Sequence, residues 1–259
     1  MTSERATGRL AGRLIGLGVT GSIAAYKAVE LLRALRAEGA DVSVMLTPSA
    51  TRFVGPLTFA ALSRHPVETD LLDLLPDGRI GHIVLADTAD AIVVAPATAH
   101  WLGAMANGLA ADVVTATCLA TSAPLVVAPA MDGDMWSHPA TRANVARLRD
   151  DFGYRIVPPA EGPLASGQSG VGRLAELETI VDAVVAAVGD RPVRAADPAA
   201  RPPLVAPAHD GYSYLQLVET VTDAQGDVVT VIVHQPNDGR AHGAAAEEAD
   251  PHRPFAHEI

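Results

Sequence analysis

The stretch RLIGLGVTGSIAAYKAVELLRALRAEG, residues 13–39, predicts the fold of this chain. It begins with a short, continuous apolar run at 13–19, which is typical of a strand buried on both faces. A glycine-containing turn follows, and from residue 22 the apolar positions recur at helical spacing until Gly39. The stretch therefore predicts a strand, a turn and a helix, which is the repeating unit of an α/β sheet.

The same unit recurs along the chain. Further apolar runs predict strands at 41–47, 91–97, 124–130 and 154–159, each followed by a helical pattern. Because these runs are continuous rather than alternating, we expect a parallel sheet covered by helices on both faces, in a Rossmann-like (flavodoxin-like) α/β fold. Ligands of such sheets bind at the carboxyl ends of the strands, so we look for function in the loops there.

Composition changes near residue 189 and divides the 259-residue chain. The α/β pattern occupies 11–188, a Pro- and Ala-rich linker is predicted at 189–210, and a tail follows at 211–259. Within the tail, apolar runs in 211–236 predict a β-hairpin, and the last residues have the composition of disorder.

Charge and composition exclude several classes of function. The net charge of −11 disfavours nucleic-acid binding, and no apolar run reaches the roughly 18–20 residues that span a bilayer. The N-terminus lacks the apolar stretch of a signal peptide, and a single cysteine, Cys118, excludes a disulfide framework. Five of the nine histidines lie beyond residue 188 and show no ligand spacing, and no metal site is predicted. We expect a cytoplasmic protein that binds neither membrane nor nucleic acid.

Two of the loops carry glycine and hydroxyl side chains. In GVTGSIAAYK (18–27), Gly18 and Gly21 permit a tight turn, and the helix N-terminus that follows suits a phosphate. Thr47 and Ser49 follow the next strand, where their hydroxyls either meet the same phosphate or cap a helix. Taken alone, these loops indicate either phosphate binding or ordinary turn chemistry.

Two later strands end in Ala-Pro-Ala, and a glycine-rich segment follows them. The prolines of APATAHW (95–101) and APAMDGDMW (128–136) interrupt the strands and direct the next residues across the edge of the sheet. The segment EGPLASGQSGVGRL (161–174) holds four glycines and a proline, which indicates a flexible loop.

Five motifs in this order, GVTGSIAAYK, IGHIVLAD, APATA, APAMDGDMW and LASGQSGVGR, resemble the FMN-dependent cysteine decarboxylases. The resemblance is greatest to the decarboxylases that act on phosphopantothenoylcysteine in coenzyme A biosynthesis. It implies FMN as cofactor and 4′-phosphopantetheine and CO₂ as products. It also implies a homo-trimer or multiple of trimers with FMN between subunits. It ends near residue 188, so a separate phosphopantothenate–cysteine ligase is expected.

The resemblance also implies which residues bind FMN. They are Gly21, Ser22, Ile23, Thr47, Ser49, Thr98, Ala99, His100, Trp101 and Ala130. His100 departs from the family, which has asparagine or aspartate at this position. Trp101 and Trp136 are candidates for cofactor or interface packing, with burial in the core as the alternative.

A histidine and a flap are the other elements that the resemblance implies. His82, in IGHIVLAD, matches the family's essential base, although a single histidine before an apolar run is more often structural. The resemblance implies that the flavin oxidises the carbon that bears sulfur, which makes an electron sink for decarboxylation. Residues 161–174 match a flap that closes over the substrate, and its glycines allow hinge motion. Met131, Asp132, Gly167 and Arg173 match substrate-binding positions, with Arg173 suited to an anionic group.

Two positions depart from the family in the catalytic machinery. Ser166 stands where many relatives have the cysteine that donates the final proton, and a hydroxyl is a far weaker acid than a thiol of pKa about 8.5. Asp132 stands where an asparagine usually binds the substrate carboxylate, and burial could keep Asp132 neutral. Two alternatives remain open: a peptidyl-cysteine decarboxylase that stops at the enethiol, and a non-catalytic flavin-binding subunit.

Overall fold

The computed structural model of the chain describes residues 8–75, 77–189, 218–222 and 228–232. The larger unit is built on a six-stranded sheet in which all neighbouring strands are parallel, in the order β3-β2-β1-β4-β5-β6. The strands are β1 (Leu14–Val19), β2 (Asp41–Leu46), β3 (Val67–Glu68), β4 (Ala91–Ala97), β5 (Leu125–Pro129) and β6 (Arg155–Ile156). The predicted parallel α/β sheet is thus confirmed.

The strand order explains both names of the predicted fold. With all six strands counted, the order 3-2-1-4-5-6 is that of a Rossmann sheet. The sequence predicts five of these strands and misses the short edge strand β3. Without β3, the remaining five strands have the order 2-1-3-4-5 of flavodoxin. In either numbering the order reverses between β1 and β4, so the ligand site of such a sheet is expected at their carboxyl ends.

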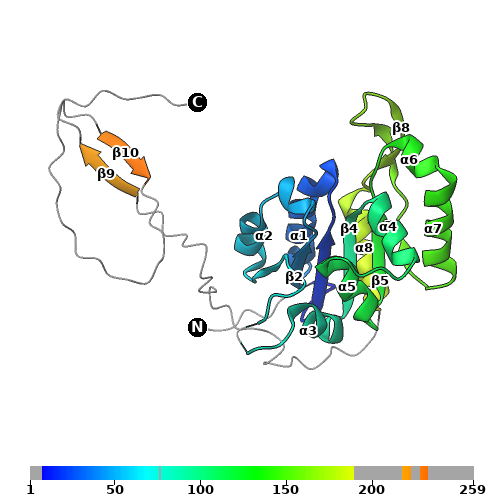
Figure 1. Cartoon of the computed structure of the whole chain (residues 1–259), viewed down its shortest axis with the longest axis horizontal. Helices are drawn as coiled ribbons and strands as arrows, with labels where there is room; N and C mark the ends of the chain where they lie inside the picture. Colours follow the sequence, from blue (N-terminus) through cyan, green and yellow to red (C-terminus); the bar gives the residue numbers. More distant parts are fainter. Residues whose placement is uncertain (1–7, 76, 190–217, 223–227, 233–259) are drawn as a thin grey trace. The chain divides into compact units, whose positions relative to one another are not determined.

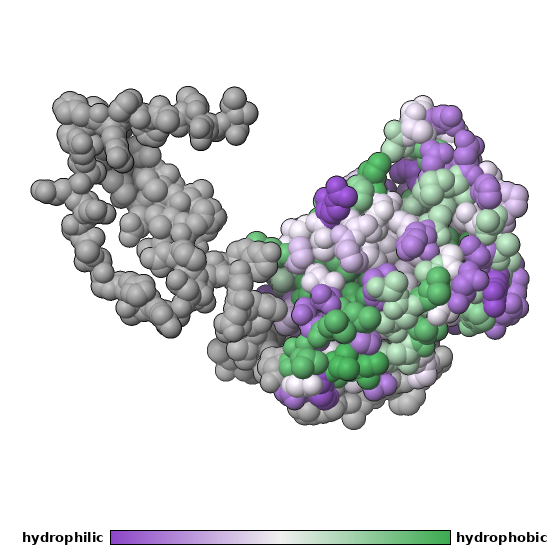
Figure 2. Space-filling model, in the orientation of Figure 1, coloured by the Kyte–Doolittle hydropathy of each residue, from purple (hydrophilic) through white to green (hydrophobic). Residues whose placement is uncertain are grey.

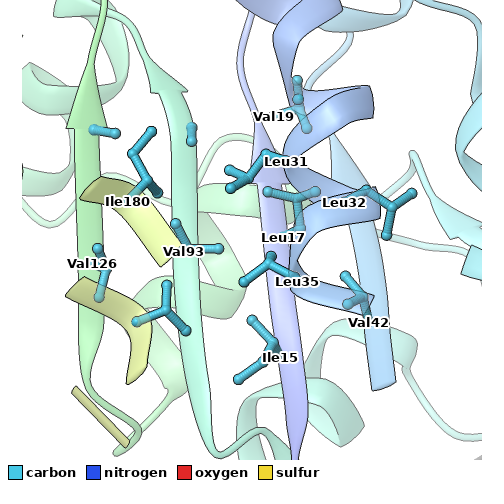
Figure 3. Close-up of a cluster of buried hydrophobic side chains, with 14 of the residues drawn as sticks. Ile15, Leu17, Val19, Leu31, Leu32, Leu35, Val42, Val93, Val126 and Ile180 are labelled. Carbon is cyan, nitrogen blue, oxygen red and sulfur yellow. The ribbon is translucent and has the colours of Figure 1, made fainter. Parts of the chain in front are cut away.

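One face of the sheet is covered by α1 (Lys27–Ala37) and α8 (Leu177–Val188). Leucines that recur on one side of α1 pack against the alternate residues of β1 that point to this face, and Ile180 of α8 packs against β4 and β5 (Figure 3). The short helix α2 (Pro56–Ser63) adds the fully buried Phe59 to the same cluster. The helical spacing seen in 22–39 therefore reports the buried side of α1, which is preceded by a short 3₁₀ turn, η1 (Ile23–Tyr26).

The other face is covered by four helices, α3 (Gly81–Thr88), α4 (Ala99–Ala106), α5 (Val113–Ala120) and α7 (Pro139–Asp150) (Figure 1). Their buried residues include Trp101 and the lone cysteine, Cys118. Burial raises the pKa of the Cys118 thiol well above its usual range. Because Cys118 is a buried thiol inside this core, its role is packing.

The glycine-rich segment at 161–174 is more regular than the sequence predicts. It contains an antiparallel pair of strands, β7 (Ala160–Pro163) and β8 (Ser169–Arg173), rather than an irregular loop. The turn between them is closed by hydrogen bonds between Leu164 and both Gly167 and Gln168. Gly167 has φ +83°, a left-handed backbone conformation that favours glycine. We call residues 160–173 the hairpin.

The chain divides into two units, residues 1–206 and 207–259. Of the second, the structure describes β9 (Val218–Thr222) and β10 (Val228–Ile232), an antiparallel pair within the segment for which the sequence predicts a hairpin. The predicted linker, apart from residue 189, and the predicted disordered end lie outside the described residues. Among the helices that the structure describes, none has the length and apolar character to cross a membrane. The cytoplasmic location stays a prediction.

Candidate functional site

The loops after β1, β2, β4 and β5 lie together at the carboxyl edge of the sheet. Thr20, directly after β1, connects two of them: its hydroxyl donates to the Pro96 carbonyl at 2.7 Å and accepts from the Thr98 backbone N–H at 3.0 Å. Thr20 is 1% exposed, so these bonds are shielded from water. Sequence reasoning did not single out Thr20, because one hydroxyl in a turn is a common feature.

Gly21 approaches the loop after β2. A Cβ atom on Gly21 would lie 2.3 Å from the Ser49 hydroxyl oxygen and 2.4 Å from its Cβ, closer than real side chains come. Only glycine therefore allows the two loops this contact. In the second loop, the hydroxyls of Thr47 and Ser49 are 3.1 Å apart. The two loops that the sequence proposed for one phosphate are thus neighbours.

Ser22 extends this set of contacts to the loop after β5. Its hydroxyl lies 3.5 Å from the Ala130 carbonyl and accepts from the Ala24 N–H at 3.3 Å, which caps η1. Thr98 caps α4 in the same way, because its hydroxyl accepts from the Trp101 N–H at 3.2 Å. We call the four linked loops the rim. Of the predicted cofactor residues, the structure places these in the rim: Gly21, Ser22, Thr47, Ser49, Thr98, Ala130.

The two tryptophans belong to the core. The Trp101 side chain is 1% exposed and the Trp136 side chain 8%, and both pack in the cluster under α4 and α7. The alternative of core burial therefore holds for the Trp101 ring, and only the Trp101 backbone meets the rim. The side chains of Ile23 and His100, unlike that of Trp101, are exposed beside the rim. Ala99, the first residue of α4, lies between Thr98 and His100.

The hairpin is seated on the residues that follow β5. The Met131 N–H donates to the Gly172 carbonyl at 2.9 Å. A Cβ atom on Gly172 would be 2.3 Å from the Met131 carbonyl oxygen, so glycine is required for this contact. The structure therefore brings the predicted flap to Met131 and Asp132, the substrate-binding residues that the sequence proposed.

The pKa of Asp132 is lowered rather than raised. Its carboxylate accepts a hydrogen bond from the Ser166 hydroxyl, and it accepts from the Asp134 N–H at 3.1 Å as the cap of α6 (Gly133–Ser137). These two bonds, with that from Ser166 the larger cause, lower the pKa of Asp132 below its ordinary value. The expectation that burial keeps Asp132 neutral is therefore wrong.

Arg173 lies along the hairpin itself. Its guanidinium covers Gly162, where a Cβ atom would be 2.6 Å from Nη1, and it is 3.8 Å from the Glu176 carboxylate. Its side chain is 35% exposed, so it keeps access to solvent. A cation held in this way can meet an anionic ligand at the hairpin.

His82 is not brought to the hairpin within one chain. It is the second residue of α3, and Figure 1 shows α3 at the lower end of the sheet, whereas the hairpin stands beyond the upper end. Partial burial lowers the pKa of His82, an effect that a hydrogen bond to the Leu71 backbone partly opposes. Within the described part of the chain, no hydrogen bond or ion pair joins His82 to Asp132 or Ser166.

Glu68 is an unpredicted neighbour of His82. A Cβ atom on Gly81, the first residue of α3, would lie 2.6 Å from a Glu68 carboxylate oxygen. Glu68 lines a small cavity of about 40 Å³ together with Asp41, His65 and Gly81. Burial, together with the nearby charge of Asp73, raises the pKa of Glu68 from 4.5 to about 7. Nothing in the sequence around Glu68 distinguishes it from an exposed carboxylate.

Comparison with known proteins places this geometry in a family. The flavoprotein family model matches residues 3–189. The coenzyme A biosynthesis bifunctional protein CoaBC of Bacillus subtilis (strain 168) is 51% identical over 172 residues, which are 66% of this chain and 42% of that protein. The protein of the same name from Escherichia coli (strain K12) is 46% identical over 68% of this chain and 43% of its own length. The chain thus spans less than half the length of these relatives.

Solved structures agree. A PPC decarboxylase mutant complexed with pantothenoylaminoethenethiol is 32% identical, with a TM-score of 0.60, over 66% of this chain and 96% of that one. The FMN-dependent cysteine decarboxylase SpaF is 36% identical, with a TM-score of 0.61, over 69% of this chain and 97% of its own. The family model covers the sheet, the rim and the hairpin together. This chain therefore belongs to the flavoprotein family.

Proposed function

We propose that this protein catalyses the FMN-dependent decarboxylation of the cysteine moiety of 4′-phosphopantothenoylcysteine, which yields 4′-phosphopantetheine and CO₂. The seating of the hairpin beside the rim carries the proposal, because a hairpin at this edge would cover a substrate bound there. The relatives at 51% and 46% identity bear the name of coenzyme A biosynthesis proteins, and a PPC decarboxylase has the same fold.

The rim fits FMN. FMN carries a phosphate, and the rim offers the hydroxyls of Ser22, Thr47 and Ser49 in loops held close by Gly21. These residues would hold the phosphate end, and Thr98 and Ala130 would meet the rest of the cofactor. The SpaF and AtHal3 structures are named as FMN-dependent and FMN-binding. When bound, FMN supplies a reversible oxidation of the carbon that bears sulfur, which gives the electrons of the departing carboxylate a place to go.

The residues of the chain divide the remaining work. Arg173 would pair with an anionic group of the substrate, and Met131 and Gly167 would contact its cysteine end beneath the hairpin. His82 would accept the substrate proton. Its lowered pKa keeps the imidazole neutral at pH 7, as a base requires.

We infer assembly into a homo-trimer, or a multiple of it, and the position of His82 supports a site shared between copies. Because one chain does not bring His82 to its own hairpin, a second copy would supply it. Figure 2 shows hydrophobic residues gathered over the part of the surface where Figure 1 places α3 and α5. Ile80 and Ile83 beside His82 are 43% and 40% exposed, and Leu119 of α5 is 51% exposed. Such a face would be covered by the neighbouring subunit.

Mixed oligomers test this assembly. A variant with His82→Asn and a variant with both Asp132→Ala and Arg173→Ala are each expected to be inactive. After unfolding and refolding together, some sites would combine an intact His82 from one chain with an intact hairpin from the other, so activity should return. No recovery, or light scattering that shows an FMN-binding monomer, would refute the shared site.

The substrate itself implies a partner enzyme. Its cysteine is joined to phosphopantothenate, so a phosphopantothenate–cysteine ligase has to act first, and we expect this ligase on a separate chain. Incubation of the two proteins with phosphopantothenate, cysteine and nucleotide triphosphate should yield CO₂ only when both are present. Release of CO₂ by this protein alone under these conditions would contradict the expectation.

The decisive experiment is an anaerobic incubation of the purified yellow protein with phosphopantothenoylcysteine, followed by mass spectrometry. Formation of 4′-phosphopantetheine supports the proposal. A product two hydrogens lighter means that decarboxylation occurs without the final reduction, and a peptide ending in cysteine should then be tried as the substrate of a peptidyl-cysteine decarboxylase. Bound FMN without CO₂ from either substrate supports the non-catalytic flavin-binding subunit.

A further inference from the structure

The hairpin contacts the residues on either side of Asp132. Besides the bond between Met131 and Gly172, a Cβ atom on Gly133 would lie 3.3 Å from Cδ1 of Leu164, at the start of the turn. Both ends of the hairpin therefore rest on the residues that flank Asp132. Ser166, two residues after Leu164, is held in reach of the Asp132 carboxylate.

The hydrogen bond between these side chains has one direction. An ionised carboxylate can only accept, so the hydroxyl of Ser166 has to donate its single hydrogen. Asp132 also accepts from the Asp134 N–H at 3.1 Å, and both bonds favour its charged form. The hydrogen of Ser166 is thus already in use, whereas the lone pairs of its oxygen remain.

We propose that Asp132 and Ser166 act as one unit, in which the carboxylate holds the hydroxyl hydrogen and leaves the Ser166 oxygen to accept a hydrogen bond from the substrate. This inference rests on the proposed function. Ser166 contacts the substrate, and Asp132 is a positioning residue. The unit presents only acceptors, and the cysteine moiety offers matching donors in its amide N–H and its S–H. The substrate carboxylate is repelled by Asp132 and is left to a cation such as Arg173.

The two departures from the family motif therefore depend on each other. Neither member of the unit has a proton to give, so the final proton comes from solvent. A cysteine introduced at position 166 would face the ionised Asp132, which disfavours the thiolate and makes the thiol a poor acid. Asp132→Asn removes that charge. The effect of Ser166→Cys should therefore depend on which residue occupies position 132.

Four proteins test this dependence: the wild type, Asp132→Asn, Ser166→Cys and the double variant. Each is incubated anaerobically with phosphopantothenoylcysteine, and the rate of 4′-phosphopantetheine formation is compared with the rate of CO₂ release. Packing changes alone would not move this ratio. For each variant, the ratio of 4′-phosphopantetheine formation to CO₂ release is divided by the same ratio for the wild type. The value for the double variant should exceed the product of the values for the two single variants by about tenfold, as expected for residues in direct contact. A ratio equal to that product overturns the proposal.

A stability cycle tests the pair without any substrate. The FMN-loaded wild type is compared with Asp132→Ala, Ser166→Ala and their double variant by urea unfolding. We expect non-additive effects for this pair and additive effects when the matched control Ser169→Ala, in the same hairpin, replaces Ser166→Ala. Additivity for Ser166 overturns the unit. If the stability effects of Asp132→Ala and Ser166→Ala are non-additive but the wild type releases no CO₂ from phosphopantothenoylcysteine, the proposed function is overturned and the unit of Asp132 and Ser166 stands.

Discussion

The Glu68 carboxylate lies against the backbone of Gly81, the residue that begins the helix carrying His82. A Cβ atom on Gly81 would be 2.6 Å from a carboxylate oxygen of Glu68. The contact is close enough that Glu68 and the start of α3 are positioned together. The paired side chains of Asp41 and His65, 2.6 Å apart, line the same cavity. The surroundings of Glu68 consequently affect both stability and the geometry of the proposed base.

Glu68 should make the protein less stable as the pH rises from about 4.5 to 7. In this window an unfolded Glu68 is ionised, whereas the folded one keeps its proton because its pKa is about 7. Unfolding releases protons, so stability falls with pH, by at most about 3 kcal/mol, and the loss is complete above pH 7. The free energy of unfolding in urea, measured at pH 5 and pH 8, tests this.

The variant Glu68→Gln isolates the effect. Its stability should fall less between pH 5 and pH 8 than that of the wild type, because glutamine does not ionise. Glu178→Gln, on the exposed side of α8, is the matched control and should behave as the wild type. An equal loss of stability in Glu68→Gln and the wild type would show that Glu68 is not the group responsible.

Gly21→Ala should weaken FMN binding strongly. The added methyl group would lie 2.3 Å from the Ser49 hydroxyl oxygen, so the first two loops of the rim have to separate. FMN retained after gel filtration, measured by visible absorption, reports the loss. Gly55→Ala is the control, since a Cβ atom there meets nothing within 4 Å. Equal FMN retention by both variants would exclude the close approach as a requirement.

Thr20→Val should destabilise the rim by about 1 kcal/mol, because the half-buried Thr98 N–H loses its hydroxyl partner, whereas the Pro96 carbonyl still accepts from the Thr20 backbone N–H at 3.3 Å. Urea unfolding of the FMN-free and FMN-loaded protein measures the change, and the loaded form should lose more. Thr58→Val, on the exposed side of α2, controls for the substitution itself. A change as small as that of the control would mean that the Thr20 bridge contributes little.

His82→Asn should lower the rate of CO₂ release by at least about 100-fold while FMN remains bound, as expected for loss of a general base. In the wild type, protonation of His82 should reduce kcat/KM only below about pH 6.5, because its folded pKa is lower than this ordinary value. The pH profile of anaerobic CO₂ release checks both statements. An acid limb that persists in His82→Asn would assign the titration to another group.

The sequence predicts the sheet well because its central strands are buried on both faces and appear as continuous apolar runs. It misses β3, since Val67–Glu68 is only two residues long and half of it is a carboxylate. It also describes the hairpin as a flexible loop. Its four glycines do indicate unusual backbone, but in the structure two of them, Gly167 and Gly172, serve a tight turn and a close contact.

The rim could be predicted because parallel strands bring their carboxyl ends to one edge, so hydroxyls far apart in sequence had to converge there. The lowered pKa of Asp132 and the raised pKa of Glu68 could not be predicted, because each depends on neighbours that only the folded chain supplies. The separation of His82 from the hairpin is a further example. Motifs give the residues of a site but do not say whether one chain contributes all of them.

The bonds between the loops of the rim have a consequence for how a ligand would arrive. Since the Thr20 and Ser22 contacts fix three of these loops before anything binds, little conformational entropy is left to be lost on association. Ligand binding should then occur at a preformed site, and the binding kinetics should show a single fast phase without a slow rearrangement. Whatever slow motion the catalytic cycle contains would belong to the hairpin.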